Sequence, residues 1–251
     1  MKMYDFSTIR DYAPIAADNA QKFINSGAFA FAAIEDIEKY LTLDLWGKSR
    51  NSEVCSSQLS MTAYSLWLAA VHMATVGHAA AVPALLRTSI ESMSYAVLIA
   101  NDHALGEVWG NRLLDGTGKN RFNSKFKNPI QKAEALTACR WVLPDNRIYN
   151  AYLNTIDFGA HPNAPLVSRN FLSMQQAEDM TWSGNYAILH EHPSSNADFG
   201  VLMCVDVGTV LCWLASTVFD DIGLLETTLL YDLEMKLQGV AGEHRKRYGA
   251  I

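Results

Sequence analysis

Apolar side chains recur at intervals of three and four residues through most of the chain, which is the spacing of one face of an α-helix. Between residues 28 and 46, for example, Phe31, Ile34, Ile37 and Leu41 form one apolar stripe. Glycine, proline and polar clusters interrupt this pattern and mark helix ends. We therefore predict helices over about 10–26, 28–46, 56–81, 83–101, 103–115, 130–143, 145–159, 198–221 and 223–247.

Two connecting segments lack helical periodicity. Residues 116–128 are predicted to form a basic loop that ends at Asn128-Pro129. An asparagine followed by proline is typical of an N-cap and a first helical position, so Asn128 is expected to cap the next helix. Residues 160–172 are rich in proline and asparagine and are predicted to be a loop.

The pattern is ambiguous around residues 173–190. Ser173-Met174-Gln175-Gln176 has the form of a capping box, which predicts the start of one short helix. Further along, Ser183-Gly184-Asn185 lies between apolar residues and indicates either a small hairpin near 181–190 or an ordered loop.

These elements predict an all-α fold, a single-domain bundle of about eight or nine helices. No internal repeat is visible, so the domain is expected to span residues 1–251. Within it we expect an N-terminal helical pair over about 10–46 and a core bundle over about 56–247. The absence of a glycine-rich strand-to-helix turn argues against dinucleotide-binding and P-loop folds.

Composition narrows the class of protein. Hydrophobic residues make up 49% and charged residues 18% of the chain, which excludes a disordered protein. The net charge of −6 argues against coating nucleic acid by bulk charge. The four cysteines form no Cys-x-x-Cys pair and are predicted to be reduced thiols of a cytoplasmic protein. No signal peptide is recognised at the N-terminus.

An apolar stretch over 201–219 contains one charged residue, Asp206. It is long enough to span a bilayer, but a charge at its centre is unfavourable there. We therefore predict a deeply buried helix and no membrane association.

Arg87 and Glu91 are the only charged residues between Val54 and Asn101. They lie four residues apart, on the same side of the predicted helix as Tyr95. One interpretation is a semi-buried ion pair that fixes helix packing. The other is a polar site in which Arg87 binds an anion and Glu91 acts as a base or ligand.

A second candidate segment ends the helix over 145–159. Asp157 and His161 are four residues apart, so the carboxylate could fix the tautomer of the imidazole and raise its basicity. That arrangement suits a general base. Alternatively, His161 caps the last carbonyls of the helix.

The segment from Ala84 to Ser92, together with Gly159-Ala160-His161-Pro162-Asn163, resembles a pattern in bacterial helical proteins of unknown function. Those proteins are similar to the HEPN-like domains. The resemblance implies a helical bundle and ribonuclease activity in a stress, defence or toxin–antitoxin setting. It implies His161 as acid/base, Arg87 as phosphate-stabilising group and Glu91 as orienting group. The candidate supporting residues are Asp157, Asn163 and Tyr95. The superfamily signature of Arg, four to six residues, then His does not occur in this chain.

The basic segment provides a candidate nucleic-acid-binding region. Cations that contact phosphate, interleaved with rings that stack on bases, are typical of single-stranded RNA sites. A solvated loop is the alternative. The residues of the segment are Lys119, Arg121, Phe122, Lys125, Phe126 and Lys127.

The histidines show none of the common metal-ligand spacings, so we predict no metal and no cofactor. The expected function is RNA binding or RNA cleavage by a cytoplasmic protein. The alternative is a non-catalytic helical scaffold or small-molecule binder in which Arg87, Glu91 and His161 form a structural polar network. A homodimer is expected because so many weakly charged helices need covering.

Overall fold

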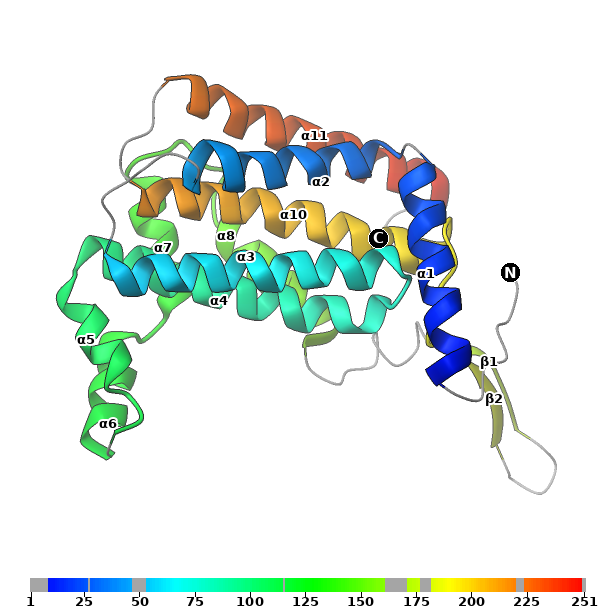
Figure 1. The fold of residues 1–251 in the computed structure, drawn as a ribbon, viewed down its shortest axis with the longest axis horizontal. Helices are drawn as coiled ribbons and strands as arrows, with labels where there is room; N and C mark the ends of the chain where they lie inside the picture. Colours follow the sequence, from blue (N-terminus) through cyan, green and yellow to red (C-terminus); the bar gives the residue numbers. More distant parts are fainter. Residues whose placement is uncertain are drawn as a thin grey trace.

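The computed structural model describes residues 9–26, 28–46, 53–114, 116–160, 171–176, 182–219 and 224–249. Within these ranges the protein is an all-α single-domain bundle with ten α-helices (Figure 1). The α-helices are α1 (Ile9–Asn25), α2 (Phe29–Lys39), α3 (Val54–Thr75), α4 (Val82–Asn101), α5 (Ala104–Gly110), α6 (Gly116–Lys125), α7 (Pro129–Ala138), α8 (Arg147–Thr155), α10 (Ser195–Val218) and α11 (Leu224–Tyr248). Shorter helical segments are η1 (Tyr40–Trp46), η2 (Ala79–Ala81) and η3 (Ile156–Ala160), and the strands are β1 (Phe171–Gln176) and β2 (Trp182–Tyr186).

The centre of the bundle is α10, which packs against α2, α3, α4 and α11. Twenty of its 24 residues are buried. Trp67 of α3 donates its indole N–H to the carbonyl of Cys204 at 2.8 Å. A Cβ at Gly208 would lie 2.7 Å from Trp67 Nε1, so glycine is needed for this close approach of the two helices.

Among the described residues, α10 alone is long and apolar enough to cross a membrane by length and composition. In this structure 94% of its apolar window is buried inside the protein. The prediction that the apolar stretch over 201–219 lies in a deeply buried helix is confirmed.

The N-terminal helices pack against the rest of the bundle. α2 packs along α10 and α11 with Ile37 fully buried, and Leu41 of η1 is fully buried in the same core. α1 crosses one end of the bundle (Figure 1) and is attached by a hydrogen bond of 3.1 Å from Asn19 Nδ2 to the carbonyl of Val76. A small apolar cluster beside that bond includes Leu189.

One local prediction is wrong, and a second is correct in position but not in its hydrogen bond. Residues 116–125 form the helix α6 rather than a loop, because Phe122 and Phe126 pack on Tyr95 and hold the turns together. Asn128 does occupy the N-cap of α7, but its backbone is left-handed, with φ of 53°, and its side chain caps no N–H group.

The hairpin also differs from its prediction. β1 and β2 pair antiparallel, with Met174 opposite Gly184, so the hairpin lies within 171–186 rather than 181–190. The short helix predicted to begin at Ser173 does not form, since this segment belongs to β1. A capping box is a local signal, and pairing with a second strand overrides it. The expected turn over 183–185 lies inside β2.

Candidate functional site

Arg87 and Glu91 form an ion pair on α4. Arg87 Nε lies 3.0 Å from Glu91 Oε1, and the two side chains are 26% and 29% exposed. Both charges therefore reach solvent, and the pair lies at the edge of the core rather than inside it.

Tyr152 of α8 completes this cluster, and no sequence pattern pointed to it. Its hydroxyl donates to Glu91 Oε1 at 3.0 Å, and the guanidinium of Arg87 lies 5.8 Å from the centre of its ring. Burial and the neighbouring Glu91 carboxylate raise the pKa of Tyr152. The tyrosine therefore stays protonated and donates to the carboxylate.

A cleft of about 340 Å³ opens beside Glu91. Tyr95, Tyr149 and Tyr152 line one part of it, and residues 128–131 at the start of α7 line another. The cleft thus combines aromatic rings with a carboxylate and with the side-chain amides of the α7 segment. Pockets with a few polar groups placed among aromatic walls are typical of small-molecule and base-binding sites.

Tyr95 joins the cleft to the basic segment. Its ring centre lies 5.8 Å from that of Phe122 and 5.3 Å from that of Phe126, both in edge-to-face geometry. The two phenylalanines stack on each other at 4.8 Å. Phe126 is only 4% exposed, so the structure does not fit its predicted role of stacking on a base. It anchors α6 instead.

The cations of the segment are placed differently from its rings. Lys119, Arg121, Lys125 and Lys127 are exposed, on α6 and in the turn that follows it. α5 and α6 extend away from the bundle at one corner (Figure 1). These cations therefore lie on a projecting surface next to the tyrosine cleft.

The structure leaves the predicted acid/base untested. His161 and Asn163 lie outside the described residues. Asp157 is exposed in η3, a segment that packs against α4. Gly159 follows with φ of 137°, where helical geometry ends. The meeting of His161 with Arg87 and Glu91 therefore stays a prediction.

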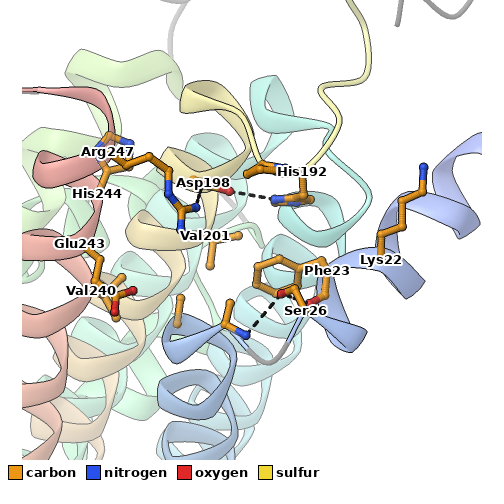
Figure 2. Close-up of a pocket in the computed structure, with 13 residues that line it drawn as sticks. Lys22, Phe23, Ser26, His192, Asp198, Val201, Val240, Glu243, His244 and Arg247 are labelled. Carbon is orange, nitrogen blue, oxygen red and sulfur yellow. Dashed lines mark hydrogen bonds and ion pairs between the residues drawn. The ribbon is translucent and has the colours of Figure 1, made fainter. Parts of the chain in front are cut away.

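A second polar cavity of about 250 Å³ lies at the other end of the bundle, among α1, α10 and α11 (Figure 2). His192 Nδ1 lies 3.0 Å from Asp198 Oδ1, and His192 Nε2 lies 3.0 Å from the carbonyl oxygen of Ala74. The Asp198 carboxylate and the Ala74 carbonyl are both hydrogen-bond acceptors, and each contacts one of the two ring nitrogens. A ring held in this way has no free nitrogen to act as a base.

Asp198 is satisfied on its other oxygen as well. Its Oδ2 accepts from Arg247 Nη1 at 3.0 Å and from the hydroxyl of Tyr248 at 2.8 Å. Burial raises the pKa of Asp198, but the hydrogen bonds from His192, Tyr248 and Arg247 outweigh it, and the pKa lies below its usual value. This cluster joins the ends of α10 and α11, and its geometry indicates a structural role.

Among the described residues, no group of three or more His, Cys, Asp or Glu side chains is arranged to hold a metal ion. His190 and His192 flank Glu191 in sequence, yet His192 is engaged with Asp198 and His190 is buried beside Gly77. The part of the chain that the structure describes therefore gives no candidate metal centre.

Comparisons of this chain with known proteins found no match. No family model matches the chain, and neither does any curated protein or any solved structure.

Proposed function

We propose that the protein binds single-stranded RNA through the cations of the α6 segment and the tyrosine cleft beside it. The observation that carries this proposal is the packing of Tyr95 on Phe122 and Phe126. Through this contact, two regions that are separate in sequence form one continuous surface. The bacterial HEPN-like relationship, a cytoplasmic location and a role in stress or defence belong to the same proposal.

The charge of this surface supports an anionic partner. No acidic residue occurs between residues 116 and 133, in a chain whose net charge is −6. Lysine and arginine side chains that contact phosphates release counterions, which favours binding and makes it salt-dependent. The five cations of this stretch are Lys119, Arg121, Lys125, Lys127 and Lys132.

The cleft supplies groups that suit an unpaired base. Tyr149 and Tyr152 are partly exposed and present ring surface, and base–aromatic stacking contributes about 1–3 kcal/mol for each base. The side chains of Glu91, Asn128 and Gln131 line the cleft and carry hydrogen-bonding atoms that suit a base edge. Unstacked bases of single-stranded RNA are recognised by this combination of rings and polar groups.

Cleavage is the further part of this proposal, and it depends on His161. As acid/base, His161 would take the proton of a ribose 2′-hydroxyl or give one to the departing 5′-oxygen. The 2′-oxygen then bonds to phosphorus as the phosphorus–5′-oxygen bond breaks, which leaves a cyclic phosphate. Arg87 would stabilise the charge on the phosphate, and Glu91 would orient one of these groups.

RNA binding is tested by fluorescence anisotropy with a labelled single-stranded RNA of mixed sequence, titrated at several salt concentrations. We expect the triple variant Lys119→Gln, Arg121→Gln, Lys125→Gln to lower the log–log salt slope by about 2, because about 0.7 counterions are released for each contact. Its matched control replaces the exposed cations Arg10, Lys39 and Lys246 by glutamine. Equal effects of the two triple variants, or no binding at low salt, would overturn the proposal.

Cleavage is tested separately by incubating the protein with the same RNA. Loss of cleavage in His161→Ala, with activity retained in the exposed-position control His103→Ala, would support the acid/base role. Cleavage that persists in His161→Ala contradicts it. Binding without cleavage supports RNA binding alone.

A structural polar network is the second candidate, and one observation favours it. Glu91 Oε1 accepts from both Arg87 and Tyr152, so the charged groups already satisfy one another without a ligand. In that case nucleotides and RNA give no thermal stabilisation, while Arg87→Ala still lowers stability.

A further inference from the structure

α3 has the composition of a buried helix, although much of it faces solvent. Its 22 residues include no Asp, Glu, Lys or Arg. α10 is comparably poor in charge, but the structure explains this, since twenty of its 24 residues are buried. Only nine residues of α3 are buried. Solvated helix faces normally carry charged residues, so the uncharged outer face of α3 calls for a covering partner.

The exposed side chains of α3 follow a regular pattern. Val54, Met61 and Leu68 recur every seven residues and are 66%, 59% and 42% exposed. The exposed positions four residues after each of them extend the same face without adding charge, and they are Gln58, Ser65 and His72. A seven-residue apolar repeat on one face of a helix is the pattern by which two helices pack side by side.

The polar groups on this face can be covered without loss of hydrogen bonds. Ser65 Oγ donates to the carbonyl of Met61 at 2.9 Å, and Thr62 Oγ1 donates to the carbonyl of Gln58 at 2.8 Å. Because these hydroxyls are satisfied within α3, burying them leaves no unpaired donor.

We propose that this face, called here the α3 seam and defined by Val54, Gln58, Met61, Ser65, Leu68 and His72, is where a second copy of the chain docks. The absence of charge favours a copy of the same chain. A twofold interface brings each patch against itself, so a charged patch would repel its own copy, whereas this one does not.

The pattern also fits one orientation. Ser65 lies near the middle of α3, so an antiparallel pair with its twofold axis at Ser65 places Met61 opposite the partner's Ala69 and Leu68 opposite the partner's Thr62. Large side chains then meet small ones, as close packing requires. In the same register Gln58 faces the partner's His72, where the two can hydrogen-bond. The contact runs along a helix about 33 Å long.

The first test is charge insertion at the axis, followed by sedimentation equilibrium. The unmodified chain is expected to be dimeric. Ser65→Glu places two carboxylates together and should weaken the dimer at least about a hundredfold, since like charges facing each other cost several kcal/mol. Ser65→Lys should do the same, and mixing the two variants should restore a dimer. Ser124→Glu, an exposed position on α6, is the matched control and should have no effect.

Cross-linking tests the orientation independently. In a Cys139→Ser background, which removes the exposed native thiol, Ser65→Cys should form a disulfide-linked dimer under mild oxidation. Ser124→Cys should not. An unmodified chain that is monomeric at about 100 µM, or a dimer that Ser65→Glu leaves intact, would overturn the proposal. A monomer that binds neutral lipid vesicles through α3 would assign the seam to a membrane surface and would equally contradict it.

Discussion

Arg147 Nη1 lies 2.8 Å from Asp206 Oδ1, so the single charge of the long apolar stretch 201–219 is paired across the bundle. Arg147 Nε also lies 3.1 Å from Glu234 Oε1, and the indole N–H of Trp213 donates to that same oxygen at 3.0 Å. The Arg147 side chain is only 12% exposed. One guanidinium therefore ties α8 to α10 and α11.

Replacing Arg147 should be strongly destabilising. Arg147→Met leaves Asp206 and Glu234 close together and without their cation, so we expect the free energy of unfolding to fall by about 3–5 kcal/mol. Urea denaturation measures it. Arg245→Met, at an exposed position of α11, is the control and should change stability by less than about 0.5 kcal/mol. A loss below about 1 kcal/mol for Arg147→Met would show that the network is not needed for stability.

Removing Arg87 should have a milder effect. Glu91 is 29% exposed and keeps its hydrogen bond from Tyr152, so Arg87→Ala should lower the free energy of unfolding by only about 1 kcal/mol. Chemical denaturation, with Arg121→Ala as an exposed control, provides the measurement. A loss above about 3 kcal/mol would mean that Glu91 is desolvated more than its exposure indicates.

The burial of Phe126 predicts that it contributes to stability. Phe126→Ala removes a ring that is 4% exposed and packs on Phe122 and Tyr95, so we expect a loss of about 3–4 kcal/mol in the free energy of unfolding. Lys125→Ala, at the exposed neighbouring position, should change it by less than about 0.5 kcal/mol. If both variants unfold at the same urea concentration as the unmodified protein, Phe126 is not an anchor for α6.

Stability should decrease as the pH falls below neutrality. Burial lowers the pKa of His78, and burial together with the neighbouring His78 lowers that of His190. In the unfolded chain the pKa of each histidine is about 6.5. Between that pH and the lowered pKa values, the two histidines bind protons in the unfolded state but stay neutral in the folded state. Lowering the pH through this range therefore favours unfolding. Each histidine then contributes up to about 1.4 kcal/mol of lost stability per pH unit.

The measurement is the free energy of unfolding between pH 7.5 and pH 5. His78→Gln should reduce the slope, because one of the two histidines with a lowered pKa no longer titrates. Asn120→Gln, at an exposed position of α6 that carries no titratable group, is the control and should leave the slope unchanged. A slope that is the same in all three proteins would contradict the assignment.

The positions of most helices could be predicted from the sequence because helix formation depends on residues that are close together in the chain. The three- and four-residue spacing of Phe31, Ile34 and Ile37, and the glycine and proline residues between segments, place most of the helices to within a few residues, although α6 was predicted to be a loop. The Arg87–Glu91 pair follows from the same geometry, since a separation of four residues brings two side chains onto one face of a helix.

Contacts between distant segments could not be predicted in this way. Tyr152 reaches Glu91 across 61 residues, and Arg147 reaches Glu234 across 87. Nothing in the local pattern around these residues marks them as partners, because their approach depends on how whole helices pack. For the same reason β1 formed a strand where a local capping signal predicted a helix.

Scarcity of charge in α3 and in α10 is a property of the sequence alone, and it shows that both helices are suited to burial. The tertiary structure decided that α10 lies at the centre while the α3 seam stays open. Whether a helix is buried depends on which other segments pack against it, and the residues of one helix do not determine that. The sequence therefore determined which helices are poor in charge, and the fold determined which of them other parts of the chain cover.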